Sequence, residues 1–270
     1  MKWRASPKPA SPRRHEVNAI AWEVRLAFTA IQYFTRLPVP GWVGYSPAQL
    51  NQSARYFPFV GIVVGAITGL AFMLAHGVFT QPVAVAIAMI AAVLVTGGFH
   101  EDGLADTCDG LGGGLDKAQA LAIMKDSRVG SYAVIGLTLA FLLKFACLSA
   151  LPAERFLWVV IAAHSFSRFM SVTVMYTQRY VRDDATAKAK PAAAGIESAP
   201  LAWAALWAVV PLGILGVAGL MAAMAAVTMR VIAARYFHQR IGGYTGDCLG
   251  AVQQMTELAF YLGLLAWIST

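Results

Sequence analysis

Long apolar segments, rarely interrupted by charge, restrict what this chain can fold into more than any other feature. The shorter segments hold about twenty residues, and a helix of that length, at 1.5 Å per residue, crosses a hydrocarbon core of about 30 Å. They show no alternation of polar and apolar residues, which favours helices over a membrane β-barrel. The sequence therefore predicts an all-α, polytopic membrane protein in a lipid bilayer, with apolar segments at 57–79, 83–99, 132–150, 156–176, 201–237 and 251–269.

Composition supports this class and excludes others. Hydrophobic residues make up 58% of the 270 residues, charged residues only 13%, and the mean hydropathy is +0.60. An average soluble domain has about 25% charged residues. Intrinsic disorder and a nucleic-acid-binding globule are therefore excluded, and no nucleic-acid partner is expected. The net charge of +7 fits basic loops on the cytoplasmic side of a membrane.

The chain is expected to form one helical membrane domain over residues 17–270, preceded by a disordered basic tail at 1–16. Residues 17–36 are apolar but contain Glu23, Arg25 and Arg36. This pattern suits an interfacial helix better than a membrane span. Between the apolar segments we expect cytoplasmic active-site loops at 97–131, 177–200 and 235–250.

The apolar segment 201–237 is too long for one crossing, which usually takes about 17–25 residues. Pro211, Gly213, Gly216 and Gly219 can break or turn it. Basic residues flank it on both sides, and the basic loops share one face of the membrane only if the segment crosses twice. The sequence therefore predicts two short helices here, about seven spans in all, and a C-terminus on the outside.

The segment GGFHEDGLADTCDGLGGG at 97–114 concentrates acidic residues. Asp102, Asp106 and Asp109 are spaced i, i+4 and i+7, which places them within about 60° of one another on a helix. Carboxylates on one face repel each other unless a cation neutralises them, and Mg²⁺ prefers such oxygen ligands. We therefore predict an Mg²⁺ site from Glu101, Asp102, Asp106 and Asp109. The alternative is a solvated acidic cap at a helix N-terminus.

The segment IMKDSRVGSY at 123–132 places Lys125 and Arg128 on either side of Asp126 and Ser127. Both basic side chains donate to phosphate oxygens, and Arg can do so with two parallel hydrogen bonds. Beside an acidic metal site, the pair is predicted to clamp a pyrophosphate. Taken alone, two basic residues before a span are more often topology anchors.

A glycine-rich loop within RYFHQRIGGYTGDCLGAVQQMTE, residues 235–257, precedes the last apolar segment. Polar groups that enter a span normally face the protein interior. We predict that this segment completes the site through Thr245, Asp247, Gln254 and Glu257; polar packing between helices is the alternative.

Two arginines are further candidates for binding the substrate. Arg168 interrupts 156–176 and needs an anionic partner, for which the acidic cluster is one candidate and interhelical hydrogen bonding an equal alternative. Arg182 follows the same segment, and topology anchoring alone would explain it. Acids for a metal and cations for phosphates together indicate transfer of a phosphorylated group.

Four motifs together resemble the cobalamin synthase family, also called adenosylcobinamide-GDP ribazoletransferase or cobalamin 5′-phosphate synthase. They are FTRLPVP at 34–40, the acidic segment 97–114, the basic segment 123–132 and GGYTGDCLGAVQQMTE at 242–257. The resemblance implies a multi-pass bacterial inner-membrane enzyme that acts at the cytoplasmic face with Mg²⁺. It implies that α-ribazole, or its 5′-phosphate, attacks the pyrophosphate of adenosylcobinamide-GDP, so that GMP leaves and the last nucleotide-loop step of vitamin B12 synthesis is completed.

Mapped onto this chain, the resemblance gives each candidate a role. Asp102, Asp106 and Asp109 would hold Mg²⁺, with Glu101 completing or orienting that shell. Lys125 and Arg128 would neutralise the phosphates, and Asp126, with His100 second, would deprotonate the ribazole hydroxyl. The expected substrate contacts are Ser127, Arg168, Arg182, Thr245, Asp247, Gln254 and Glu257. A homo-oligomer is a further possibility.

Two other functions share features with this sequence. Asp106-x-x-Asp109-Gly110 matches the opening of the CDP-alcohol phosphotransferase signature, but the rest of that signature is missing. Intramembrane acids and glycine-broken helices also occur in transporters, whose sites lie near the bilayer midplane. Here the acids cluster towards one face, which favours an enzyme.

Overall fold

The computed structural model describes residues 19–182 and 195–268, and these ranges are helical throughout apart from turns and one isolated β-bridge. The all-α prediction is therefore confirmed for this part of the chain. The predicted tail at 1–16 lies outside it. The helices are α1 (Ala19–Phe34), α2 (Pro47–Gln52), α3 (Phe57–His76), α4 (Gln81–Thr96), α5 (Phe99–Gly113), α6 (Lys117–Ile123), α7 (Ser131–Ser149), α8 (Phe156–Thr177), α10 (Ser198–Ile241) and α11 (Gly246–Ile268), with short 3₁₀ turns at Gly41–Val43, Ser53–Tyr56 and Ala153–Arg155.

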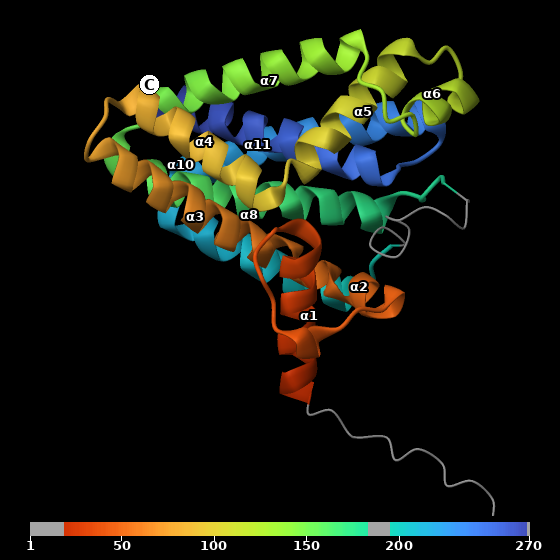
Figure 1. Cartoon of the computed structure of the whole chain (residues 1–270), viewed down its shortest axis with the longest axis horizontal. Helices are drawn as coiled ribbons and strands as arrows, with labels where there is room; N and C mark the ends of the chain where they lie inside the picture. Colours follow the sequence, from red (N-terminus) through yellow and green to blue (C-terminus); the bar gives the residue numbers. More distant parts are fainter. Residues whose placement is uncertain (1–18, 183–194, 269–270) are drawn as a thin grey trace, which may run out of the picture.

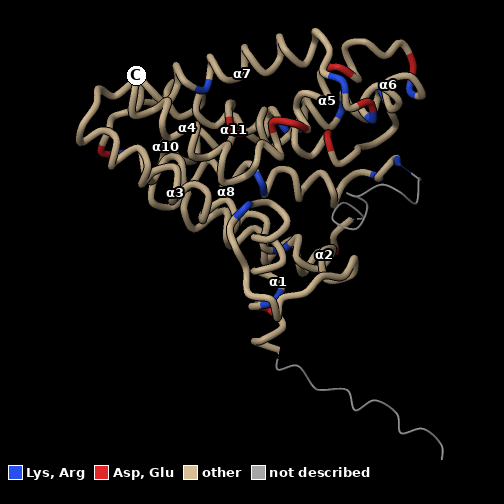
Figure 2. Tube along the Cα trace, in the orientation of Figure 1, with Lys and Arg blue, Asp and Glu red and all other residues tan. Residues whose placement is uncertain are grey.

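The long helices run roughly along the long axis of the molecule, and α1 lies across them (Figure 1). Helix α1 agrees with the helix expected at 17–36, and it exposes Ile20 and Val24. Most charged residues lie around α5 and α6 at one end of the bundle and around α1 and α2 (Figure 2). The opposite end, near the described C-terminus, carries few of them.

Small residues let α3 and α8 pack in close antiparallel contact. A Cβ atom built on Gly61 would meet the backbone of His164, and one built on Gly69 would meet Leu157. At Gly65, a Cβ would lie 2.6 Å from the Cα of Ile161. Because the backbones touch here, these glycines set the distance between the two helices.

We expect Gly65→Ala to lower the unfolding free energy by about 1–3 kcal/mol, because the added methyl group forces the backbones of α3 and α8 apart. Gly213→Ala is the matched control, since a Cβ there meets nothing within 4 Å and Ala favours helix by about 1 kcal/mol over Gly. Denaturant unfolding of both variants in detergent checks this. Equal stability of the two variants would contradict the close contact.

Helix α10 contains the break that the sequence predicted in 201–237. Gly216 has non-helical dihedral angles (φ 59°, ψ −135°), whereas Pro211 stays inside a helical stretch. The chain doubles back there, since a Cβ on Gly219 would lie 2.8 Å from the carbonyl oxygen of Leu212. The first half of α10 contacts α8 through a hydrogen bond from Ser165 to the Trp207 carbonyl oxygen, and the second half packs on α11 at Gly263.

The number of membrane spans is not confirmed as about seven. By length and apolar composition, four helical segments in the described ranges can cross a membrane: Pro47–His76, Ser131–Ser149, Ala153–Thr177 and Ser198–Ile241. A fifth arises if α4 and α5, which meet at 88°, form one broken span. The structure thus supports a helical membrane protein with several spans.

Two of the three predicted loops are largely helical. Residues 97–131 contain α5 and α6, and 235–250 contain the end of α10 and the start of α11. Gly97 and Gly98 both have positive φ, which turns the chain sharply between α4 and α5. Helix α5 then forms despite its aspartates and glycines because tertiary packing outweighs helix propensity. Much of the third segment, 177–200, lies outside the described residues.

Candidate active site

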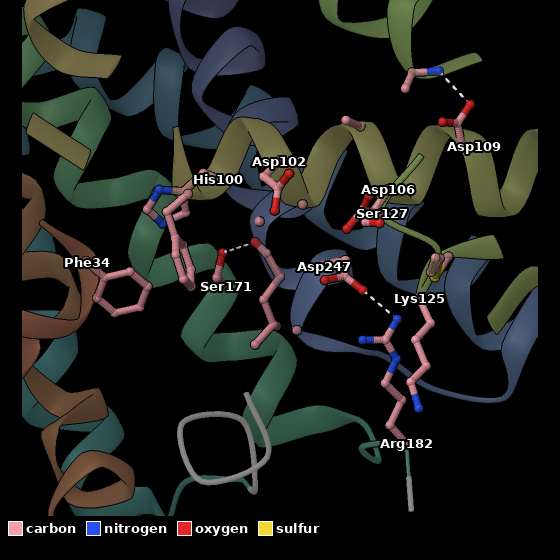
Figure 3. Close-up of a pocket in the computed structure, with 18 of the residues that line it drawn as sticks. Phe34, His100, Asp102, Asp106, Asp109, Lys125, Ser127, Ser171, Arg182 and Asp247 are labelled. Atoms are coloured by element: carbon pink, nitrogen blue, oxygen red, sulfur yellow. Dashed lines mark hydrogen bonds and ion pairs between the residues drawn. The ribbon is translucent and has the colours of Figure 1, made fainter. Parts of the chain in front are cut away.

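A cavity of about 590 Å³ opens at the charged end of the bundle (Figure 3). Its walls come from α1, α5, the 124–129 segment, the end of α8 and the start of α11. Most of the residues that the sequence singled out line it: His100, Asp102, Asp106, Asp109, Lys125, Asp126, Ser127, Arg128, Arg168, Arg182 and Asp247. The structure thus gathers all the motifs quoted from the sequence around one space.

Helix α5 brings its acids to the cavity by packing directly on α11. A Cβ on Gly103 would lie 2.9 Å from the carbonyl oxygen of Asp247 and 3.1 Å from the Cα of Gly250. This contact sets Asp102 and Asp106 beside Asp247 on one wall (Figure 3). The predicted acidic face of α5 is therefore present, and α11 adds a carboxylate to it.

Asp109 is bound differently from the other two aspartates of α5. Its Oδ2 accepts a hydrogen bond from the Gly130 amide at 2.6 Å, and its Oδ1 accepts one from the Ala133 amide at 2.9 Å. The first turn of a helix leaves its amide groups unpaired, and a carboxylate there is favourable. Asp109 therefore caps α7 and ties that helix to α5, a role that the spacing of the acids did not indicate.

The 124–129 segment presents Lys125 and Ser127 to the cavity, and it holds Asp126 and Arg128 as a pair. The Arg128 side chain donates to Asp126 Oδ2 at 2.5 Å and 3.0 Å, and the Arg128 amide donates to Asp126 Oδ1 at 3.0 Å. These hydrogen bonds lower the pKa of Asp126 to about 2. A carboxylate with so low a pKa is a weak proton acceptor at neutral pH.

Arg182 is positioned by backbone hydrogen bonds between the segment after α8 and the segment before α11. The Val181 amide donates to the Tyr244 carbonyl oxygen, and the Tyr244 amide donates to the Arg179 carbonyl oxygen, both at 3.0 Å. Gly243 is required at this crossing, because a Cβ there would meet the Arg179 carbonyl oxygen. The pairing leads Arg182 to Asp247, with a nitrogen–oxygen distance of 2.9 Å.

Thr245 supports this site without lining it. Its hydroxyl oxygen accepts a hydrogen bond from the Cys248 amide at 3.3 Å, which caps the start of α11. The same hydroxyl donates to Asp247 Oδ2 at 3.3 Å. Thr245 is fully buried, so its contact is with Asp247 and the α11 terminus.

Glu101, Gln254 and Glu257 lie behind the cavity in a buried polar network. Lys144 of α7 is 3.0 Å from Glu257 and 3.0 Å from the Gln254 side-chain oxygen. Gln254 in turn donates to Glu101 at 3.0 Å. The network is completed by His164, 3.4 Å from Glu257, and by Tyr261, which donates to Glu257 at 3.0 Å.

Arg168 lies between the cavity and this network. Its guanidinium donates to the His164 carbonyl oxygen at 2.9 Å, within its own helix. It is 3% exposed and reaches both the cavity and the small pocket around Glu257. No hydrogen bond is described between it and the acids of α5, which the sequence had proposed as partners.

Several residues of the site were not predicted from the sequence. Lys144 is a single basic residue in an apolar segment, and that was the available signal. Phe34 begins the FTRLPVP motif but was given no role. The aromatic lining also includes Tyr33, Phe57 and Phe99.

Within the described residues, no group of three or more His, Cys, Asp or Glu side chains is arranged to hold a metal ion by itself. The acids instead spread along the cavity wall on α5 and α11. Mg²⁺ is commonly held by one or two carboxylates together with substrate phosphates. Asp102, Asp106 and Asp247 fit such a partial set, because they face a space large enough for phosphates.

Comparisons with known proteins show to which family this chain belongs. The family model described as cobalamin-5-phosphate synthase matches residues 26–265. A relative named adenosylcobinamide-GDP ribazoletransferase from Leptothrix cholodnii is 47% identical over 93% of this chain and 98% of its own length. Relatives with the same name from Ralstonia pickettii (44% identical, 94% of this chain, all of the relative) and Shewanella woodyi (42%, 93% and 99%) are similar.

No solved structure matches the chain. The family match covers most of the sequence and all the segments that form the cavity. The chain belongs to the cobalamin-5-phosphate synthase family.

Proposed function

We propose that the chain transfers the adenosylcobinamide phosphate group from adenosylcobinamide-GDP to α-ribazole or its 5′-phosphate. The new phosphodiester forms as the pyrophosphate bond breaks and GMP leaves. The observation that carries this proposal is the single cavity in which the acids of α5 and α11 face the cations of the 124–129 segment and Arg182. Relatives that match this chain over nearly their whole length are named adenosylcobinamide-GDP ribazoletransferase, which supports this donor and acceptor.

The cations of the cavity neutralise negative charge on the substrate. A pyrophosphate carries several negative charges, and GMP gains charge as it leaves. Lys125, Arg128 and Arg182 line the same cavity and are placed to neutralise that charge. Arg182 is held by Asp247, and Arg128 by Asp126, so both are pre-oriented rather than ordered only when substrate binds.

We assign the Mg²⁺ contacts to Asp102, Asp106 and Asp247. When bound, the metal would polarise a phosphoryl oxygen and offset its charge. Asp109 is left out of this set because both its oxygens accept backbone hydrogen bonds at the start of α7. Its part is to hold α5 and α7 together at the cavity wall.

The proton acceptor for the ribazole hydroxyl is better assigned to His100 than to Asp126. Asp126 would have to break its contact with Arg128 before it took a proton. The His100 ring lines the cavity and stacks on Phe34 at 5.4 Å between centroids. Its ring nitrogen can accept a proton in the neutral form.

We expect Asp126→Asn to lower kcat less than about ten-fold, because a general base contributes about 10²–10⁴ and Asp126 does not fill that role. Arg128→Gln should cost more, about 10²–10³-fold, because it removes a charge that neutralises the leaving phosphate. Steady-state kinetics of GMP release measures both. A hundred-fold or larger loss in Asp126→Asn would restore Asp126 as the base.

We also propose that the cavity faces the cytoplasm and that the membrane is the bacterial inner membrane. The support is charge distribution: Lys117, Lys125, Arg179, Arg182 and Arg240 all belong to segments at the cavity end. Basic residues that flank spans are enriched on the cytoplasmic side.

The donor preference tests the proposed function. Purified protein should release GMP from adenosylcobinamide-GDP only when α-ribazole or its phosphate is present. A CDP-linked lipid precursor offered in the same assay should yield no CMP. Release of CMP with no release of GMP would overturn the proposal.

A further inference from the structure

The cavity has two chemically different ends (Figure 3). Asp106, Lys125, Arg182 and Asp247 lie towards one end, and Phe34 and His100 lie at the other, with Asp102 and Ser171 between them. Tyr33, Phe34, Phe57, Phe99 and His100 also line the cavity, and we call these five rings the aromatic wall. The proposed function uses the charged end and leaves most of the wall without a role.

The aromatic wall is assembled from three separate parts of the chain. Phe34 of α1 contacts Phe57 of α3 edge-on at 4.5 Å between ring centroids, and contacts Phe99 of α5 edge-on at 5.2 Å. The His100 ring lies parallel to Phe34, with 9° between the planes. Tyr33 meets Phe99 at 5.3 Å. Edge-to-face contacts of this kind fix ring orientations, so the wall is pre-formed.

Phe99 is the most exposed ring of the wall. Phe34 is only 7% exposed, because its neighbours cover it, whereas Phe99 is 39% exposed. Phe99 can therefore offer ring surface to a bound molecule without rearrangement of the others. Stacking on aromatic side chains is a common way to bind a planar base.

The polarity of the wall selects which base fits. Its only polar atoms are the Tyr33 hydroxyl and the His100 ring nitrogens, since Phe34, Phe57 and Phe99 offer none. Guanine carries several donors and acceptors on its edge, and a buried polar group without a partner is costly. A benzimidazole has hydrocarbon edges and only ring nitrogens, so it loses little when enclosed here.

We propose that the aromatic wall is the binding subsite for the planar, mainly apolar heteroaromatic base of the acceptor nucleoside. This inference rests on the proposed function. The acceptor base then lies at the aromatic end, and the donor pyrophosphate lies at the charged end. The acceptor ribose lies between the two ends beside Asp102, with its hydroxyl between the His100 ring, which takes the proton, and the donor phosphate.

Phe99→Leu tests the proposal, because it removes the ring and keeps an apolar side chain of similar size. We expect the KM for α-ribazole to rise about ten-fold, in line with the loss of one base–aromatic stack. The KM for adenosylcobinamide-GDP should stay within about two-fold. Phe99→Trp should restore the acceptor KM because it restores a stacking face. Phe79→Leu, in the exposed connection between α3 and α4, is the control and should change neither KM.

Equilibrium binding of α-ribazole to the same variants tests the aromatic wall independently of the transfer reaction. If wild-type protein releases no GMP, the proposed function fails, while weaker α-ribazole binding to Phe99→Leu would still support the aromatic wall. A rise in the donor KM with an unchanged acceptor KM would place guanine at the wall and overturn the inference. Unchanged KM values and unchanged α-ribazole binding in Phe99→Leu would overturn it as well.

Discussion

Asp106→Asn is expected to reduce GMP release by about 10²–10³-fold while leaving the protein folded. Loss of one preorganised electrostatic contact to a reacting group has a cost of that order. Asp106 lines the cavity on α5, next to Asp102 and opposite Arg182. The amide keeps the shape of the side chain but cannot supply the charge that holds Mg²⁺ against a phosphate. Activity is measured as GMP release over a range of Mg²⁺ concentrations.

The control for this change is Asp116→Asn. Asp116 caps α6 by accepting a hydrogen bond from the Gln119 amide at 2.9 Å, and it does not line the cavity. Asn caps helices about as well as Asp, so this variant should keep full activity. If Asp106→Asn retained more than a tenth of wild-type activity, the carboxylate of Asp106 would not be part of the metal site.

The second large effect concerns the buried network behind the cavity. Glu257→Gln is expected to lower the unfolding free energy by about 3–5 kcal/mol, because it leaves the Lys144 charge buried without its partner. Glu257 is fully buried, Lys144 is 7% exposed, and the two are 3.0 Å apart. Reversible unfolding in detergent or bicelles measures the change.

A double variant tests whether the charges of Lys144 and Glu257 stabilise each other. Replacing both partners of a buried ion pair by apolar residues is often nearly neutral, whereas removing one is costly. Lys144→Met with Glu257→Leu should therefore be more stable than Lys144→Met alone. Additive losses in the double variant would show that the two charges do not stabilise each other.

The sequence predicted that the acidic, basic and glycine-rich segments lie close together, because each of them lies at one end of an apolar segment. Apolar runs become long helices, and their ends must meet at one face of the bundle. The acidic face of α5 could also be predicted from the spacing of its acids, since Asp102 and Asp106 are one helical turn apart. These parts of the site follow from local pattern alone.

Other assignments depended on contacts between distant parts of the chain. Asp109 shares the spacing of the other acids, but its partners are amides more than twenty residues later. Asp247 and Gln254 share a face of α11, yet that helix packs on α5 along its length, so Asp247 reaches the cavity while Gln254 meets Glu101 and Lys144. Helical periodicity gives the face of a residue and not its depth in the bundle.

The turn in the longest apolar segment shows the same limit. Four candidate residues could break it, and no local pattern distinguishes among them. Pro at position 211 stays helical, and the reversal occurs at Gly216, where a positive φ is needed. Only glycine adopts that conformation at low cost.

The most direct measurement is the yield of GMP and corrinoid product from purified wild-type protein supplied with adenosylcobinamide-GDP, α-ribazole 5′-phosphate and Mg²⁺. We expect one GMP for each corrinoid product, a product mass that retains one phosphate between corrinoid and ribazole, and no release without the acceptor. Release of GMP that does not require the acceptor, or a product that has lost the bridging phosphate, would contradict phosphate-group transfer as the function of this cavity.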